Sequence, residues 1–200
     1  AYSRASVGEY LLIKLTSRYE ERPLPKVSIV DLREELKKGN RSVLSTELKT
    51  SLQETLRRKE QAMLFLNRRG YAGFVSCRAC GHVMKCPHCD VSLSEHNGSR
   101  LVCHYCGYET VKPQSCPSCG SPHIGGFKAG TQQIEKVIEK YFPEAKVLRM
   151  DFDTTRTKDS YEKILDSFAR HEADILVGTQ MIVKGHDFPD VTLVGVIAAD

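Results

Sequence analysis

The amino-acid sequence predicts an α/β protein in which a small cysteine-rich module interrupts a parallel sheet. Two observations support this prediction. Short, nearly continuous apolar runs alternate with amphipathic helical patterns on either side of the chain's middle, which is typical of a parallel sheet covered by helices on both faces. Between these two parts, all eight cysteines of the 200-residue chain lie within residues 77–119.

The first elements are predicted before the cysteines. Residues 27–31 form a short β-rich run, Val-Ser-Ile-Val-Asp. Apolar side chains then recur every four residues, which predicts one face of a helix. They are Leu44, Leu48, Leu52 and Leu56. Residues 62–66 are nearly all apolar and predict a buried strand, which ends in a turn with two cations, Asn67-Arg68-Arg69-Gly70.

The elements after the cysteines follow the same alternation. Helices are predicted at residues 131–142 and 159–170. Their inward-facing side chains are expected to be Ile134, Val137, Ile138 and Tyr141, then Tyr161, Ile164, Leu165 and Phe168. Strands are predicted at residues 146–151, 174–178 and 193–198. Because the chain starts without Met and stops in an apolar run, we expect it to be a piece of a larger protein.

Composition limits the class of protein. A hydrophobic fraction of 40% is enough for the core of one ordinary domain with a small insert. The net charge of +4 and the pI near 8.6 permit contact with nucleic acid without requiring it. The sequence has neither an apolar signal-like stretch at its start nor a run long enough to span a membrane. We therefore expect a cytoplasmic protein.

The spacing of the cysteines predicts two four-cysteine zinc sites. They form four CxxC pairs, Cys77/Cys80, Cys86/Cys89, Cys103/Cys106 and Cys116/Cys119. Two thiolates separated by two residues can bind one face of a tetrahedral ion. Disulfides would need an oxidising compartment, and a thioredoxin-type site uses a single CxxC at a helix start. Tight-turn residues accompany the pairs, namely Gly81, Gly107, Gly120, Pro87 and Pro117.

Two ways of sharing the pairs between the ions remain open. The inner pairs are separated by thirteen residues, close to the spacing of a zinc ribbon. This favours a nested arrangement, with one site of Cys86, Cys89, Cys103 and Cys106, and the other of Cys77, Cys80, Cys116 and Cys119. In the cross-braced alternative, the first and third pairs bind together. The histidines are surplus to eight sulfur ligands: His82, His88, His96, His104 and His123.

A polar loop follows the strand predicted at residues 174–178. Residues 178–189 read GTQMIVKGHDFP and combine a glycine, hydroxyl and amide donors, a lysine and an aspartate. In open α/β sheets, such loops after the strands usually carry the chemistry. The donors suit phosphates and the carboxylate suits a ribose hydroxyl, although a polar loop that only connects two strands is an alternative.

The whole set of motifs resembles the replication-restart DNA helicases of superfamily 2, the primosomal protein N′ family. Residues 178–189 resemble motif V of these helicases. The further matching strings occur in the same order along most of the chain, at residues 39–42, 64–71, 77–81, 129–131 and 149–155. The resemblance implies a second RecA-like helicase lobe with an inserted two-zinc module, and that family pairs its zinc ligands in the nested way.

The resemblance also implies an activity and its contacts. Members of this family hydrolyse ATP with Mg²⁺, translocate 3′ to 5′ on single-stranded DNA and recognise abandoned forks and D-loops. They act with single-stranded-DNA-binding protein and primosome components. By carry-over, DNA- or nucleotide-contacting positions would be Thr179, Gln180, Lys184, Gly185 and Asp187, with Gly130 and Thr131, and with Arg68 and Arg69. The two arginines are equally consistent with an exposed pair that has no role.

The expected domain boundaries follow from this resemblance. Residues 1–76 would be the first part of the lobe, 77–123 the zinc module and 124–200 the rest of the lobe. The chain has no GxxxxGK[ST] phosphate loop, and the family's motif VI would follow Asp200. Since phosphoryl transfer needs these parts together, we expect this chain alone neither to hydrolyse ATP nor to unwind DNA.

A non-enzymatic zinc-stabilised module that binds DNA or protein is the second hypothesis. Residues 77–119 carry four cations and three carboxylates, and eight thiolates with two Zn²⁺ bring the sum to −3. This balance is not that of a strong phosphate-binding patch. Tyr105 and Tyr108, with Arg100 nearby, suit base stacking, but we expect both tyrosines to pack beneath the zinc sites. A free-standing zinc-ribbon protein would leave the α/β flanks unexplained.

Overall fold

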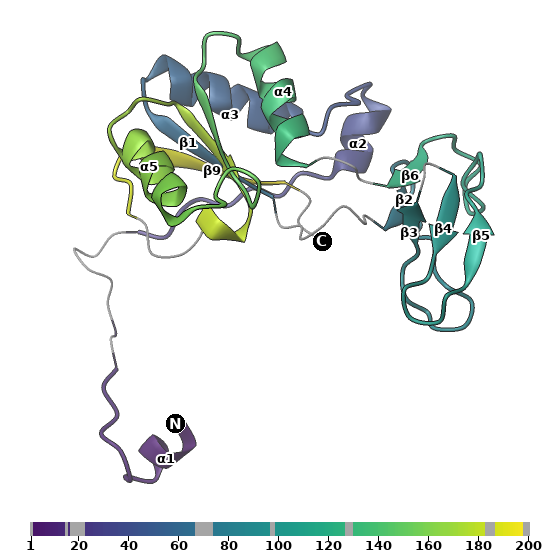
Figure 1. The fold of residues 1–200 in the computed structure, drawn as a ribbon, viewed down its shortest axis with the longest axis horizontal. Coiled ribbons are helices and arrows are strands. Elements are labelled where there is room, and N and C mark those ends of the chain that lie inside the picture. The colour runs from purple at the N-terminus through teal and green to yellow at the C-terminus, as the bar shows by residue number, and fades with distance from the viewer. Residues whose placement is uncertain are drawn as a thin grey trace.

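The structure is a computed structural model. It describes residues 2–14, 16, 23–66, 74–96, 99–126, 130–182 and 187–197, with the side chain of residue 158 left aside. All structural statements below concern these residues. Figure 1 shows two bodies side by side, a lobe of sheet and helices and a smaller module built of strands.

A four-stranded parallel sheet forms the centre of the lobe. Its strands lie in the order β7 (Val147–Met150), β8 (Ile175–Gly178), β1 (Gln61–Leu66) and β9 (Val191–Ile197). Each neighbouring pair runs parallel. The predicted α/β class, with a parallel sheet interrupted by a small cysteine-rich module, is therefore confirmed. The four strands predicted at residues 62–66, 146–151, 174–178 and 193–198 are right to within two residues at each described end.

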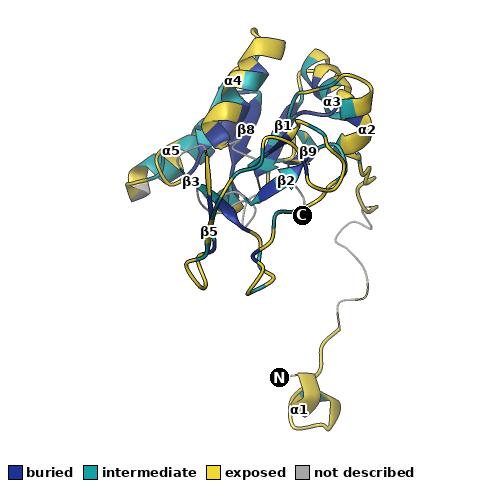
Figure 2. Cartoon of the chain, turned by 90° about the vertical axis from the view of Figure 1, so that its right-hand side faces the viewer, coloured by how far each residue is buried: buried dark blue, intermediate teal, exposed yellow. Residues whose placement is uncertain are grey.

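Helices cover both faces of the sheet, as the alternation of buried side chains requires. On one face, Leu64 and Val177 pack with Leu52 of α3 (Thr46–Arg57) and Ile134 of α4 (Thr131–Tyr141). On the other face, Leu176 packs with Phe168 of α5 (Lys158–Ala169). Figure 2 shows this dark-blue buried layer between the helices.

Hydrogen bonds at the ends of helices and strands support the lobe. The amide of Gln61, at the start of β1, donates to the carbonyls of Phe168 and Ala173, each at 2.8 Å. These two hydrogen bonds join the start of β1 to the end of α5 and to the segment before β8. Ser45 and Thr157 accept backbone N–H groups as N-caps of α3 and α5, whereas Gly130, before α4, has no side chain to do so.

Three details of the sequence prediction are wrong. Residues 27–31 form no strand, since Val27 and Ile29 are 78% and 94% exposed and none of the strands in the described part of the chain pairs with them. Leu44 is buried but precedes α3, so tertiary packing rather than helical periodicity places it inward. Tyr141 is 45% exposed, and the ammonium of Lys49 lies 4.2 Å from its ring centroid.

The first described segment lies apart from the sheet (Figure 1). It contains α1 (Tyr2–Ser6), and none of the described residues before Ile29 is buried. Further along, α2 (Leu32–Lys37) lies between the lobe's larger helices and the module in Figure 1. Among the described helices, none combines the length and apolar character that crossing a membrane requires.

The module is closed at its base by two antiparallel strands, β2 (Val75–Cys77) and β6 (Ile124–Gly126). Beyond them lies a three-stranded antiparallel sheet of β3 (Ser94–His96), β4 (Arg100–Val102) and β5 (Glu109–Val111). Its buried cluster has eight residues, and four of them are cysteines. So small an apolar core does not fold a segment of this length by itself.

The side chain of Glu35, on α2, links this helix to the start of α3 through hydrogen bonds. Its carboxylate accepts hydrogen bonds from the Asn40 side-chain amide at 2.6 Å and from the Thr46 backbone N–H at 2.6 Å and hydroxyl at 2.7 Å. These bonds, first that of Asn40 and then those of Thr46, lower the pKa of Glu35 to about 2. The charged form is thus the one that the fold stabilises.

The stability of the lobe should therefore depend on pH through Glu35. Because the folded pKa lies below an unfolded value of about 4.3, the contribution is complete above about pH 5 and is lost as pH falls toward about 2. Glu35→Gln should flatten this acid branch of the unfolding free energy, measured by urea titration at several pH values. Glu34→Gln, which breaks an exposed pair with Lys37, is the control and should match wild type. Equal acid branches in wild type and Glu35→Gln would contradict the assignment.

Candidate metal centres and nucleic-acid interface

The four CxxC pairs adopt one repeated turn. In each, the carbonyl of the first cysteine accepts the N–H of the residue four positions on, at 2.8–3.0 Å. That residue has a positive φ in every case, at Gly81, Asp90, Gly107 and Gly120. Glycine adopts this conformation without strain, and aspartate tolerates it better than most residues. Asp90 therefore takes the place that glycine has in the other three turns, a role that the sequence analysis missed.

The turns bring the sulfur atoms into two clusters of four. One contains Cys77, Cys80, Cys116 and Cys119, and the other contains Cys86, Cys89, Cys103 and Cys106. Within each cluster all four sulfurs lie within 4.8 Å of one another. This is the nested arrangement, in which the outer pairs meet at the base of the module and the inner pairs farther out. The cross-braced alternative would need different sets of sulfurs together.

The sulfur separations suit tetrahedral zinc. The distances from Cys77 to Cys119 and from Cys80 to Cys116 are both 3.7 Å, and that from Cys86 to Cys106 is 3.6 Å. A tetrahedron with zinc–sulfur bonds of about 2.3 Å places its sulfurs about 3.8 Å apart. A disulfide requires about 2.05 Å, so these cysteines are not joined in pairs. Two four-cysteine clusters of this geometry support two zinc ions.

Hydrogen bonds around the sulfurs favour some thiolates over others. In the inner cluster, the backbone N–H of Cys106 contributes most to lowering the pKa of Cys103 to about 7. The side chain of Cys106 contributes most to raising the pKa of Cys89 to about 12. Zinc binds thiolates, so a zinc ion that binds this cluster must displace the protons of the protonated thiols. Zinc binding should therefore release protons to the solution.

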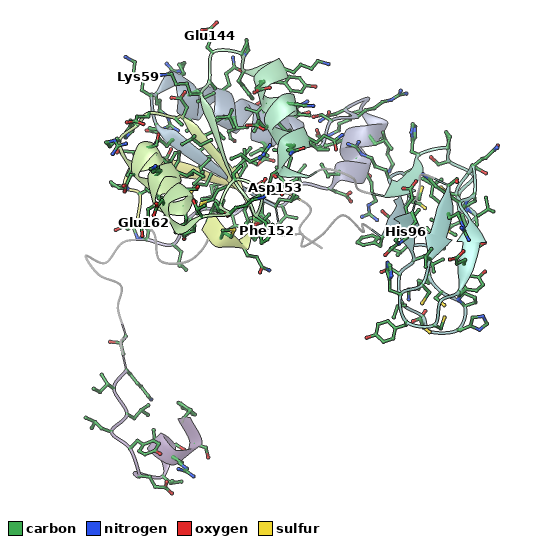
Figure 3. All side chains as sticks on the ribbon, in the orientation of Figure 1. Lys59, His96, Glu144, Phe152, Asp153 and Glu162 are labelled. Carbon is green, nitrogen blue, oxygen red and sulfur yellow. The ribbon has the colours of Figure 1, made fainter. Side chains whose placement is uncertain are left out.

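The histidines lie outside both sulfur clusters, as the surplus of ligands led us to expect. His96 and His104 contact each other through their Nε2 atoms at 3.1 Å. His88 packs edge-on against the ring of Tyr108, with 5.4 Å between ring centroids. Figure 3 labels His96 on the module. Packing and hydrogen bonding account for these three side chains.

Every cation in residues 77–119 is engaged within the protein. Lys85 pairs with Asp90 at 3.1 Å, Arg100 pairs with Glu109, and Lys112 pairs with the buried carboxylate of Glu95 at 3.1 Å. The guanidinium of Arg78 donates to backbone carbonyls of the lobe. The module thus presents few uncompensated charges to the phosphates of a nucleic acid.

The two tyrosines of the module have different surroundings. Tyr108 is partly buried and packs against the cysteine-rich cluster, as expected. Tyr105 is 84% exposed, so the expectation that it lies beneath the zinc sites is wrong. It stands between Cys103 and Cys106, and His104 in the same turn is exposed as well.

The loop resembling motif V leaves the sheet at the carboxyl end of β8. A Cβ on Gly178 would lie 2.7 Å from the carbonyl oxygen of Met150 and 2.5 Å from Ile182, so only glycine fits this close approach. Thr179 is half-buried, while Gln180 is exposed at the start of a short 3₁₀ turn, η2 (Gln180–Ile182). Asp187 is also exposed. Lys184, Gly185, Arg68 and Arg69 lie outside the described residues, and their contacts stay predictions.

A buried polar network borders this loop. Asp151 follows β7 and accepts a hydrogen bond from the hydroxyl of Thr131. The guanidinium of Arg149 lies 2.8 Å from Asp151 and 3.0 Å from Glu135 of α4. Although burial raises the pKa of Asp151, the hydrogen bonds and the Arg149 charge lower it overall. The hydroxyl of Thr131 is therefore occupied by a hydrogen bond inside the lobe, while Gly130 beside it is exposed.

Asp151 also shapes the turn that follows β7. Its carboxylate accepts the backbone N–H groups of Asp153 and Thr154, each at 3.0 Å. Its carbonyl accepts the hydroxyl of Thr155 at 2.6 Å. Phe152 is consequently held outward and is 82% exposed (Figure 3). Residues 149–155 were predicted as a family motif, but the sequence did not reveal that Asp151 supports the turn.

The start of the loop after β8, at Thr179 and Met181, lies beside the turn after β7. The backbone N–H of Thr179 points to the carbonyl of Met150 at 3.4 Å, and the hydroxyl of Thr155 lies 3.5 Å from the sulfur of Met181. The turn after β7 and the loop after β8 are thus neighbours. Ligands of open α/β sheets bind at this carboxyl edge.

Comparison with known proteins identifies the relatives of this chain. Residues 86–110 match the family described as the PriA DNA helicase Cys-rich region (CRR) domain. The whole chain is 55% identical to 25% of the replication restart protein PriA of Bacillus subtilis (strain 168). It is 40% identical, again over its whole length, to 27% of the Chlamydia pneumoniae protein of that name. For the Synechocystis protein, identity is 50% over 94% of this chain and 23% of the relative.

The chain therefore spans about a quarter of the length of these relatives. The similarity extends over the parallel sheet as well as the cysteine-rich module, because 94–100% of the chain is aligned. This confirms the family that the motifs had indicated. The chain belongs to the PriA family of replication restart proteins.

Proposed function

We propose that this chain is the second RecA-like lobe, with an inserted two-zinc module, of an ATP-dependent 3′ to 5′ DNA helicase that acts in replication restart. The observation that carries the proposal is the identity of 55% over the whole chain with a replication restart protein. The domain boundaries proposed are 1–76 and 124–200 for the lobe and 77–123 for the module.

The carboxyl edge of the sheet suits a lobe that binds a DNA strand through its phosphates. Gln180 is exposed there, and Gly130 leaves the start of α4 open. Backbone N–H groups at a helix start favour phosphate oxygens. We assign Thr179, Gln180, Lys184 and Gly185, with Gly130, to DNA or nucleotide phosphate. Arg68 and Arg69 would contribute further phosphate contacts, and Thr131 would position the start of α4 through Asp151.

ATP and Mg²⁺ would bind between this lobe and a first lobe that carries the phosphate loop. Asp187 would face that cleft or the ribose. Contacts of this kind read no base sequence, so binding should weaken as salt increases. Zinc, when bound, has a structural role: four thiolates per ion hold the module folded and complete its small core.

The proposed partners follow from the same assignment. They are single-stranded DNA, forks and D-loops, together with single-stranded-DNA-binding protein and primosome components. The direct test is ATP-dependent unwinding by the intact protein that contains this chain. Duplexes with a 3′ single-stranded tail on the loading strand should be unwound, and those with only a 5′ tail should not. Absence of ATP-dependent unwinding, or the opposite polarity, would contradict the proposal.

A second candidate is a non-enzymatic module that docks other proteins. It is favoured by the engaged cations of residues 77–119 and by exposed Tyr105 and Val111. Anisotropy of labelled single-stranded and forked DNA with the zinc-loaded chain separates the two. Salt-sensitive binding that disappears on zinc removal, with the lobe still folded, would place the module on the DNA path. Absence of binding at low salt would favour protein docking.

A further inference from the structure

One side chain connects the base of the zinc module to the lobe. Arg78 lies between the zinc ligands Cys77 and Cys80. Its guanidinium donates to the carbonyl of Arg41 at 2.6 Å and to that of Ser42 at 2.5 Å, with Asn40 at 3.4 Å. The fixed fork of a guanidinium can satisfy several carbonyls at once, which an ammonium cannot do with the same geometry.

The three carbonyls form a prepared site, which we call the Arg78 socket (the carbonyls of residues 40–42). The side chain of Asn40 shapes it, since its oxygen accepts the Ser42 N–H at 3.0 Å and its amide donates to the Leu44 carbonyl at 3.0 Å. Glu35 in turn accepts from Asn40. Because Leu44 is fully buried in the lobe, the socket is part of the lobe rather than a loose loop.

The module side of the contact is equally constrained. The backbone N–H of Arg78 donates to the carbonyl of His123 at 2.9 Å, which ties it to the other half of the module. The neighbouring turn also approaches the lobe: a Cβ on Gly81 would lie 3.6 Å from Nη1 of Arg33, on α2. Figure 1 shows α2 beside this end of the module.

We propose that Arg78 is a positioning residue that locks the orientation of the zinc module on the lobe. The outer zinc site fixes Arg78 at its two flanking ligands, and the socket fixes the guanidinium. Motion of the lobe is thereby transmitted to the module as one rigid unit. Loss of Arg78 should free the orientation of the module while both zinc sites remain filled.

One consequence rests on the proposed helicase function. In the intact protein, Arg78→Ala should reduce the number of base pairs unwound per ATP hydrolysed while ATP hydrolysis persists. If the protein were not a helicase, this consequence would fail but the docking would remain. The docking is therefore tested without DNA or ATP.

The test is single-molecule fluorescence energy transfer in the intact protein, with dyes on unnatural amino acids at Tyr105 of the module and Glu144 of the lobe, both exposed. Unnatural amino acids are needed because the cysteines are ligands. Wild type should give one narrow distribution of transfer efficiency. In Arg78→Ala, with two zinc ions still bound per chain, the single narrow population of transfer efficiency should be replaced by a broad distribution. Arg100→Ala, which removes a module arginine that pairs with Glu109, is the matched control and should match wild type.

Two further arms separate positioning from folding. Arg78→Lys keeps the charge and the stem but not the fork, so its distribution should be intermediate. Free guanidinium ion, added to Arg78→Ala well below denaturing concentrations, should narrow the distribution again. An unchanged distribution in Arg78→Ala with both zinc ions bound would overturn the proposal. So would broadening in Arg100→Ala equal to that in Arg78→Ala. A different case arises if Arg78→Ala is found to lose its zinc. In that case the proposal would be overturned if zinc-loaded Arg78→Lys gave the same distribution of transfer efficiency as wild type.

Discussion

Replacing the four inner ligands, Cys86, Cys89, Cys103 and Cys106, with serine is expected to leave one zinc ion bound per chain. In the nested arrangement these cysteines form one complete cluster, so the outer cluster stays whole. A cross-braced protein would lose half of each site and bind none. Zinc per chain, measured by native mass spectrometry, separates the two results.

The matched control for this prediction replaces one pair from each cluster. Serine at Cys77, Cys80, Cys103 and Cys106 also removes four ligands, yet it breaks both nested sites. This variant should bind no zinc, whereas a cross-braced protein would keep one ion. The opposite pattern in the two quadruple variants would contradict the nested geometry.

The effect on folding should be large but confined to the module. A structural zinc site contributes about 10–16 kcal/mol of apparent binding free energy in zinc-finger peptides at neutral pH. The module has little else, because Val75, Leu93, Leu101 and Ile124 are the only other members of its buried cluster among the described residues. Loss of the inner site should expose the amides of β3–β5 to hydrogen exchange. Amides of β1 and β8 should keep their protection, since their core lies in the lobe.

Asp151→Ala is expected to destabilise the lobe by about 3 kcal/mol. The change leaves the guanidinium of Arg149, only 17% exposed, without its nearer carboxylate, and it removes the acceptor for Thr131. It also frees the two backbone N–H groups that shape the turn after β7. Because that turn adjoins the loop after β8, DNA-stimulated ATP hydrolysis by the intact protein should fall as well.

Two variants calibrate this result. Asp153→Ala removes a carboxylate two positions away whose pair with Arg156 is exposed, so the expected cost is about 0–1 kcal/mol. Asp151→Asn keeps acceptors for the turn but loses the charge, so it should lie between the two. Urea unfolding of the three variants measures all of these effects. A cost below about 1 kcal/mol for Asp151→Ala would show that the network is not a structural support.

The sequence predicted the sheet and its helices well because their side-chain periodicity is strong. Residues 62–66 and 174–178 are nearly continuous apolar runs, and both are central strands. Residues 27–31 have the same β-branched character, but Val27 and Ile29 are exposed and none of the described strands pairs with this segment. Strand propensity is realised only where pairing and burial support it, and a local pattern does not reveal whether a partner strand exists.

The two four-cysteine clusters were predictable for a different reason. CxxC spacing fixes pairs of ligands locally, and the ribbon-like gap favoured the nested pairing that the structure has. Asp90 was not predicted, since an aspartate takes the positive φ that glycine has in the other three turns. The available signal was its position: it follows the second CxxC pair where glycine follows each of the other three pairs.

Contacts between distant segments left no comparable signal. Arg78 meets the carbonyls of residues 40–42 only after the module is placed beside the lobe. Thr131 and Asp151 are twenty residues apart and meet because α4 and β7 pack together. Each depends on tertiary geometry, so residue types alone did not show that Arg78 docks or that Asp151 is structural.

The most direct test of whether the zinc module works within a helicase uses the intact protein with Cys86→Ser and Cys89→Ser. These changes break the inner zinc site and leave the carboxyl edge of the sheet untouched. If the module works within the motor, unwinding of naked duplex should fall about tenfold or more while DNA-stimulated ATP hydrolysis changes little. Undiminished unwinding, with only the assembly of partner proteins lost, would contradict this account and assign the module to protein docking.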